Sequence, residues 1–125
     1  MDSLEKYSND LQKLVMNQYG ELIRACTDEY SASGMRQIRK SVDFLIEQSL
    51  PEQVQLGRHI ILLALKRAEM MVRELGMDAL GISAVLIIDV VEQNDVSYDQ
   101  IKAKLGERTG QIIKELLKIS DLDTT

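Results

Sequence analysis

Apolar residues recur at three-, four- and seven-residue steps along most of the chain, which is the pattern of amphipathic α-helices. In residues 2–27 this stripe consists of Leu4, Leu11, Leu14, Val15, Leu22 and Ile23. A small, turn-prone segment at residues 31–34 separates it from a second stripe, formed by Met35, Ile38, Val42, Leu45 and Ile46. The pattern therefore predicts one helix over residues 2–27 and another over residues 35–49.

The middle of the chain predicts two further helices with strongly apolar centres. Pro51 suits the first turn of a helix over residues 51–75, and Gly76 suits the left-handed residue that ends it. Residues 60–65 are apolar on every face, so we expect this third helix to be central in the fold. A fourth helix, which opens near Asp78 and runs to about Gln93, carries a similar apolar run and is also expected to be buried.

Two shorter patterns complete the predicted bundle. Ser97 and Gln100 have the spacing of a capping box and predict a helix over residues 98–105. Gly106 separates it from a last helix over residues 107–120, whose apolar face consists of Ile112, Ile113, Leu116, Leu117 and Ile119. The sequence thus predicts an all-α fold of about six helices, and a length of 125 residues is room for one domain over residues 1–125.

Composition and charge narrow the classes of function. The chain has 1 proline and 7 glycines, few of the residues that tight hairpins need. A net charge of −5 argues against direct nucleic-acid binding and against an anionic membrane surface. The basic cluster at residues 36–40 is therefore interpreted as a solvated helix face, and Gly106 and Gly110 follow no strand that would make them a phosphate loop. No apolar run reaches the roughly 20 residues of a membrane span.

The single cysteine and single histidine limit the chemistry further. Cys26 excludes an internal disulfide and a cysteine-built zinc site, and it favours a reducing, cytoplasmic location. Its close neighbours are acidic, so we do not expect a reactive thiolate. His59 cannot form a multi-histidine metal centre alone, and we expect an ordinary packed side chain there.

Asp89 is the residue that local patterning does not explain. It is flanked by isoleucine and valine, where a carboxylate would lose its hydration and need a partner. Glu92 lies three positions later on the same side of the helix, so the two carboxyls could converge on a cation or on one basic side chain. We favour an ion pair between Asp89 and an arginine or lysine of a neighbouring helix, with a metal as the alternative.

The second half of the chain resembles the hydrolase domain of the RelA/SpoT homologues, the synthetases and hydrolases of guanosine tetra- and pentaphosphate. Residues 84–93, AVLIIDVVEQ, match a family run that reads approximately AALLHDVVED, and the resemblance continues in residues 95–97, Ile101, residues 105–106 and residues 117–120. Upstream, Gly57 and Ile61 fall on the glycine and isoleucine of the family pattern RxSGEPYIxHP, and the resemblance covers about residues 49–120. The implied fold is an HD-domain-like helical bundle.

The resemblance also implies which positions carried the chemistry in active members. Their metal, typically manganese, is held by two upstream histidines, a His-Asp pair and a distant aspartate. The histidine positions are Ser49, Leu63 and Ile88 in this chain, which leaves Asp89. The Glu-Asp pair that serves the hydrolytic step is Glu92 and Gln93 here, and the nucleotide-binding arginine falls on Val54. His59 aligns with the family proline.

These departures predict a filled-in site without catalytic, cofactor-binding or metal-binding residues in this chain. The resemblance implies an inactive, regulatory hydrolase-like domain of a GTP pyrophosphokinase (ATP:GTP 3′-diphosphotransferase), and the parent enzyme would make (p)ppGpp in the stringent response. The expected partner is the synthetase domain of the same protein, with a homo-oligomer possible. Because the chain ends at residues 121–125 directly after the last predicted helix, we expect it to be a piece of a longer protein. A weakly active metal-dependent (p)ppGpp hydrolase and a freestanding helical interaction module stay open as alternatives.

Overall fold

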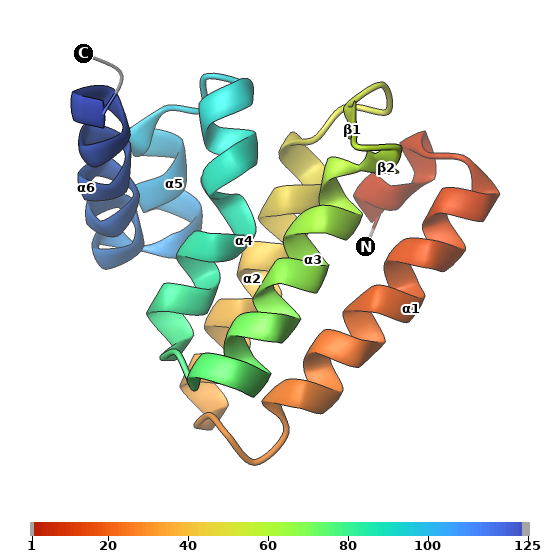
Figure 1. The fold of residues 1–125 in the computed structure, drawn as a ribbon, viewed down its shortest axis with the longest axis horizontal. Coiled ribbons are helices and arrows are strands. Elements are labelled where there is room, and N and C mark those ends of the chain that lie inside the picture. The colour runs from red at the N-terminus through yellow and green to blue at the C-terminus, as the bar shows by residue number, and fades with distance from the viewer. Residues whose placement is uncertain (1, 124–125) are drawn as a thin grey trace.

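The computed structural model describes residues 2–123 as a helical bundle (Figure 1). In chain order the elements are a 3-10 helix η1 (Asp2–Lys6), α1 (Asn9–Cys26), α2 (Ala32–Gln48), β1 (Val54–Gln55), β2 (Arg58–His59), α3 (Ile60–Met70), a π-helical segment η2 (Met71–Leu75), α4 (Ala79–Gln93), α5 (Tyr98–Leu105) and α6 (Glu107–Asp123). Six α-helices and one short hairpin in these residues confirm the all-α prediction.

Side-chain caps begin five of the helices, including α3, which His59 caps. The capping residues in front of α1, α2, α4 and α5 are Ser8, Ser31, Asp78 and Ser97. Each accepts a hydrogen bond from a backbone N–H of the first turn, which would otherwise have no partner. The predicted capping box of Ser97 and Gln100 is confirmed, and Gly76 has the predicted left-handed backbone, with φ of 58°.

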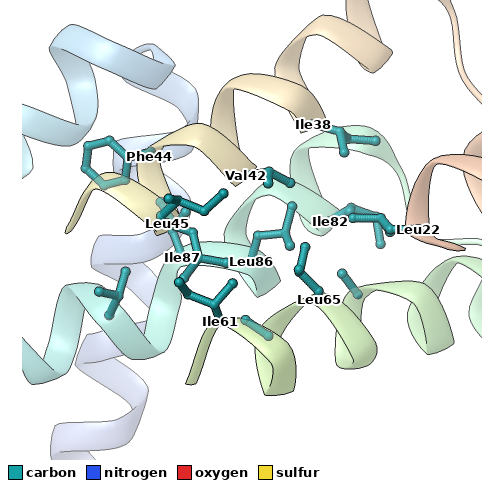
Figure 2. Packing of buried hydrophobic residues seen from close by; sticks show 14 of the residues in the cluster. Leu22, Ile38, Val42, Phe44, Leu45, Ile61, Leu65, Ile82, Leu86 and Ile87 are labelled. Carbon is teal, nitrogen blue, oxygen red and sulfur yellow. The ribbon is translucent and has the colours of Figure 1, made fainter. Parts of the chain in front are cut away.

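The core lies where α2, α3 and α4 meet. α4 packs against α2, α3 and α6, and α3 also packs against α1, which lies beside it in Figure 1. Figure 2 shows the centre of this cluster, where fully buried side chains of the three helices interdigitate: Val42, Leu45, Ile61, Leu65, Leu86 and Ile87. Burying each such aliphatic side chain contributes about 1.5–3 kcal/mol, so the apolar runs of α3 and α4 supply much of the stability.

The predicted third helix begins at the wrong residue. Residues 51–59 form a turn and a hairpin, in which Val54 pairs with His59 and Gln55 with Arg58, and α3 begins only at Ile60. Between Pro51 and His59 the sequence has no apolar helical stripe, so a helix there would have nothing to bury. Gln53 stabilises the turn instead, because its side-chain oxygen accepts a hydrogen bond from the Leu50 N–H, with an N–O distance of 2.8 Å.

Two other predicted helix boundaries and one predicted apolar face also differ. The helix predicted over residues 2–27 is interrupted at Tyr7, whose hydroxyl donates to the carbonyl oxygens of Ile46 and Ser49 and so fixes η1 against the end of α2. α2 begins three residues earlier than predicted because Ser31 caps it. In α6 Leu116 is 39% exposed, outside the buried face that was predicted for it, and the Ile119 side chain lies outside the described part.

Within residues 2–123 no helix is both long and apolar enough to cross a bilayer.

Candidate functional site

The sequence-predicted site positions lie at the ends and along the faces of three neighbouring helices. They are Ser49 directly after α2, Leu63 in α3, and Ile88, Asp89, Glu92 and Gln93 in α4. α4 packs against both α2 and α3, so the fold brings these three helices together around the candidate site. What the site can do depends on which polar atoms these positions offer.

The polar groups of Ser49 form hydrogen bonds at the end of α2. Its side chain is fully buried, and its hydroxyl donates to the Leu45 carbonyl oxygen at 2.6 Å. Its own carbonyl oxygen accepts hydrogen bonds from the Tyr7 hydroxyl at 2.9 Å and from the Lys6 ammonium at 2.6 Å. These bonds satisfy carbonyl groups that the helix end leaves unpaired, so Ser49 serves to close α2.

Leu63 and Ile88 offer no ligand atoms at all. Both side chains are half-buried, and Ile88 packs against the hydrophobic core cluster. The sequence predicted a filled-in site, in which these aliphatic side chains form ordinary core. The structure corrects this, because the faces of α3 and α4 that carry these two residues are only partly covered.

Asp89 forms the predicted ion pair. Its Oδ2 atom lies 2.8 Å from Nη2 of Arg67, so the pair joins α4 to α3. The expected burial is wrong, because the side chains of Arg67 and Asp89 are 38% and 37% exposed. Apolar sequence neighbours at positions 88 and 90 did not bury Asp89, because residues adjacent on a helix point in different directions. The pair is therefore partly hydrated and screened by solvent.

The two positions at the end of α4 are exposed and do not join this ion pair. Glu92 is exposed and forms no ion pair with any residue of the described range, so the two carboxyls do not converge on Arg67. Gln93 is also exposed, and its side-chain oxygen accepts a hydrogen bond of 3.3 Å from the amide of Gln53. A neutral amide has no basic lone pair suited to activating water.

The residues present do not fit the manganese ion of the family. Among residues 2–123 no group of three or more histidine, cysteine, aspartate or glutamate side chains could hold a metal. At the candidate positions, the Ser49 hydroxyl is bonded to the backbone, Leu63 and Ile88 have no donor atom, and Asp89 is bonded to Arg67. A single available carboxylate cannot hold a divalent ion against water.

His59 and Cys26 have structural environments, as the sequence analysis expected. His59 is 4% exposed and caps α3, because its Nδ1 accepts a hydrogen bond from the Ile61 N–H. Its Nε2 lies 2.8 Å from the Leu50 carbonyl oxygen, and burial lowers the pKa of the imidazole. Cys26 is fully buried, and this burial raises the pKa of its thiol to about 11. A thiol of that kind is not a nucleophile at neutral pH.

The family's nucleotide-binding position lies on the hairpin. Val54 is in β1 and is 56% exposed, and Gly57 occupies the turn with φ of 75°. Leu56 shares the turn with φ of 53° and is 95% exposed. The hairpin therefore presents aliphatic side chains at the position where the family pattern has an arginine.

Glu69 is a buried carboxylate that was not singled out from the sequence. Glu69 is 7% exposed and accepts hydrogen bonds from Gln18 of α1 at 2.8 Å and from Arg73 at 2.9 Å. Burial acts to raise its pKa, but the bonds from Arg73 and Gln18 and the charge of Lys66 outweigh this effect and lower the pKa overall. Its spacing from Ile61 and Leu65 gave the signal, because positions four residues apart share one helix face.

A second polar cluster that sequence reasoning missed joins α2 to α4 and α6. The Gln37 amide donates to the Thr109 hydroxyl at 2.8 Å and to the Leu105 carbonyl oxygen at 3.0 Å, and Ser41 and Ser83 hydrogen-bond to each other. Ser41, Ser83 and Thr109 are fully buried. Every one of these side chains has a partner, so the cluster orients helices and offers no free group for chemistry.

Comparison with known proteins identifies two relatives. The chain is 30% identical, over 86 residues, to the guanosine-3′,5′-bis(diphosphate) 3′-pyrophosphohydrolase of Aquifex aeolicus; this is 69% of the chain and 12% of that protein. It is 40% identical, over 50 residues, to the probable guanosine-3′,5′-bis(diphosphate) 3′-pyrophosphohydrolase of Synechocystis, which is 40% of the chain and 7% of that protein.

The matched part is thus a small share of each relative's length. No family model and no solved structure matches the chain. The two relatives, the all-helical fold and the pattern of residues 84–93 agree with one another. The chain is similar to the HD-type hydrolase domain of the RelA/SpoT homologues, and the resemblance predicted from the sequence is confirmed at that level.

Proposed function

We propose that the chain is a hydrolase-like domain of a stringent-response protein that no longer hydrolyses (p)ppGpp and instead regulates a (p)ppGpp synthetase. The observation that carries the proposal is the state of Asp89. It is the remaining metal-ligand position in the chain, and its carboxylate is bonded to Arg67. An acid held by a guanidinium, between positions with aliphatic side chains, offers too few ligand atoms to hold the ion that would activate water for hydrolysis.

The printed names of both relatives support the substrate class. The Aquifex relative is named a 3′-pyrophosphohydrolase of guanosine 3′,5′-bis(diphosphate) and the Synechocystis relative a probable one, so we propose that the fold of this chain derives from one that accommodated this nucleotide. Loss of ligands at several positions, with preservation of the helices around them, is what selection for a structural or regulatory role would leave. The regulatory partner we propose is a nucleotide pyrophosphokinase domain of the same protein, whose conformational equilibrium this domain would bias.

Activity and metal content test the loss of hydrolysis together. The purified chain is incubated with ppGpp and MnCl₂, with the Aquifex pyrophosphohydrolase as the positive control, and pyrophosphate release is measured. We expect release at the background rate, and elemental analysis of the chain should find manganese well below one equivalent. Release above background that requires manganese, or one tightly bound equivalent of metal, would establish a weakly active hydrolase and defeat the proposal.

The regulatory part of the proposal is tested separately. The reading frame that encodes this chain, followed past Thr125, is expected to encode a nucleotide pyrophosphokinase domain. If it does, the synthetase with and without residues 1–125 should differ in its rate of pyrophosphate transfer from ATP to GDP. If no such domain is present, the chain is a freestanding helical interaction module, and the regulatory proposal is wrong.

A further inference from the structure

The partner of Asp89 is placed where it can do more than form one surface ion pair. Arg67 lies four residues after Leu63, so the two share one face of α3. Asp89 follows Ile88 directly in α4. Leu63 and Ile88, which resemble metal-ligand positions of the family, therefore lie near a permanent positive charge. This charge belongs to Arg67, one turn along α3, which contacts the remaining acid, Asp89, in α4.

The Arg67 guanidinium forms its side-chain hydrogen bond with Asp89. Within the described range its side chain has one hydrogen-bond partner, Oδ2 of Asp89, and Asp89 likewise has one, Nη2 of Arg67. The two residues are 22 positions apart in sequence and belong to different helices, so their contact crosses the interface between α3 and α4. A metal ion bound by one ligand from each helix would cross the same interface.

The charges also balance without an ion. A divalent cation requires two or more negative ligands, or several neutral donors, to replace its water. The one remaining carboxylate needs a single positive charge, and an arginine supplies one that cannot be lost by deprotonation. Leu63 and Ile88 supply no ligand atom for a cation. A cation at this site could therefore only neutralise Asp89, which Arg67 already does.

We propose that the guanidinium of Arg67 has taken the place of the divalent cation, and that it holds α3 to α4 through Asp89 and excludes cations from this site. This inference rests on the proposed function above, because it assumes that the site is a former metal centre. It adds a specific role for a residue that the resemblance does not assign. Replacing the guanidinium by a second carboxylate should therefore make the site responsive to an added cation.

The test is thermal unfolding of the full chain with and without millimolar MnCl₂. Arg67→Asp replaces the internal cation by a carboxylate that faces Asp89. We expect a lowered Tm without metal, and a rise of about 3–5 °C with Mn²⁺, as for a ligand present at roughly ten times its Kd. The unaltered chain should show no rise. Arg24→Asp is the matched control, because Arg24 pairs with Glu21 at the surface of α1 and the change in net charge is the same.

Each outcome decides the inference. It is overturned if Mn²⁺ raises the Tm of the unaltered chain as much as that of Arg67→Asp, or if Arg67→Asp responds no more than Arg24→Asp. A second measurement does not depend on the folding of Arg67→Asp: Arg67→Gln, Asp89→Asn and the double variant form a cycle. The sum of the Tm losses of the two single variants should exceed the Tm loss of the double variant. A double-variant loss equal to that sum would also overturn the inference.

Failure here and failure of the proposed function give different results. An Arg67→Asp variant that ignores Mn²⁺, in a chain that still shows no hydrolysis, removes only the role of Arg67. Manganese-dependent hydrolysis by the unaltered chain removes the proposed function itself, whatever the variant does.

Discussion

His59 shows how a lone histidine becomes a structural residue. The Ile61 N–H can only donate, so Nδ1 must accept, and the ring proton is therefore on Nε2, which donates to the Leu50 carbonyl oxygen. The ring joins the start of α3 to the turn before the hairpin. This arrangement requires the neutral imidazole, because a second ring proton would leave no lone pair for Ile61.

The pH dependence of stability should therefore report on His59. Burial lowers its folded-state pKa below the ordinary 6.5, so the unfolded chain binds more protons in this range. Stability from His59 is present above about pH 6.5 and is lost as the pH falls through the folded pKa, with a limiting slope of about 1.4 kcal/mol per pH unit. Urea unfolding in steps from pH 7.5 to 5.5 measures this loss.

His59→Asn is the control for that experiment. Asparagine keeps a capping oxygen at the start of α3 but does not titrate. The free energy of unfolding of the variant should fall less than that of the unaltered chain over the same pH range. Parallel curves for the two proteins would show that the His59 imidazole accepts a proton in the folded state without penalty.

Glu69 and Asp89 are two ion-paired carboxylates in opposite solvent environments. The Glu69 side chain is 9% exposed and has three partners, whereas the Asp89 side chain is 37% exposed and has one. Hydrogen bonds to a buried charged group contribute about 1.5–3 kcal/mol, and exposed pairs about 0–1 kcal/mol. We expect Glu69→Gln to lower the free energy of unfolding by about 2 kcal/mol and Asp89→Asn by less than about 1 kcal/mol.

Urea unfolding at low and high salt checks this order. The cost of Asp89→Asn should shrink at high salt because solvent ions screen the exposed pair. The cost of Glu69→Gln should persist. If Asp89→Asn proved the more costly of the two, the Arg67–Asp89 contact would be buried in solution and the exposures given above would be wrong.

At the scale of elements, the hairpin between α2 and α3 contains a local conflict. Leu56 and Gly57 both have positive φ, of 53° and 75°, as a two-residue hairpin turn requires. Glycine adopts this conformation at no cost, but a leucine Cβ clashes with the backbone there at a cost of about 1–2 kcal/mol. Since the Leu56 side chain is 95% exposed, its packing does not offset the free-energy cost of the strained backbone.

Replacing Leu56 should consequently stabilise the protein. Leu56→Asn introduces a residue that tolerates the left-handed region and precedes glycine in the preferred hairpin turn. We expect the free energy of unfolding to rise by about 0.5–1 kcal/mol, measured by urea or thermal unfolding. Leu14→Asn, at a 52% exposed site in α1, removes the same kind of side chain without relieving strain and should lower stability slightly. A loss on Leu56→Asn would mean that the leucine has a partner.

The same hairpin shows where sequence reasoning about this fold stopped. Local signals were sufficient for the helix ends at Gly76 and Ser97, because caps depend on residues within one turn. They were insufficient at Pro51, which is equally suited to starting a helix or a turn. The hairpin depends on cross-strand pairing and on a strained leucine, and neither leaves a periodic pattern in the sequence.

The candidate site was predictable in its chemistry but not in its burial. The sequence alone indicated that Asp89 needed a basic partner, and the structure supplies Arg67. The spacing of Glu69 from Ile61 and Leu65 places it on the buried face of α3, but its contact with Gln18, 51 positions away, depends on packing between helices and leaves no local signal. The vestigial character of Ser49, Leu63 and Ile88 came from the resemblance and stays a prediction.

At the scale of the whole molecule, one hydrophobic cluster includes residues from all six α-helices. Cys26 belongs to it at the end of α1, and Ile113 belongs to it in α6, at the other end of the chain. The polar cluster around Gln37 also ties α2 to α4 and α6. With a single shared core, the described part should unfold as one cooperative unit.

The thiol of Cys26 can report on that cooperativity. It is fully buried, and burial raises its pKa to about 11, so a disulfide reagent at pH 8 should react only when the protein opens. Ile113→Val removes one buried methylene from α6 and should cost about 1 kcal/mol, which multiplies the open population by about five. If the molecule opens as a unit, the rate of Cys26 labelling should rise by the same factor. Leu116→Ala, at a 39% exposed position of the same helix, should change the rate little. A lower urea stability for Ile113→Val with an unchanged labelling rate would show instead that α1 separates from the bundle on its own, because the thiol would then be exposed without any loss of the α6 contacts.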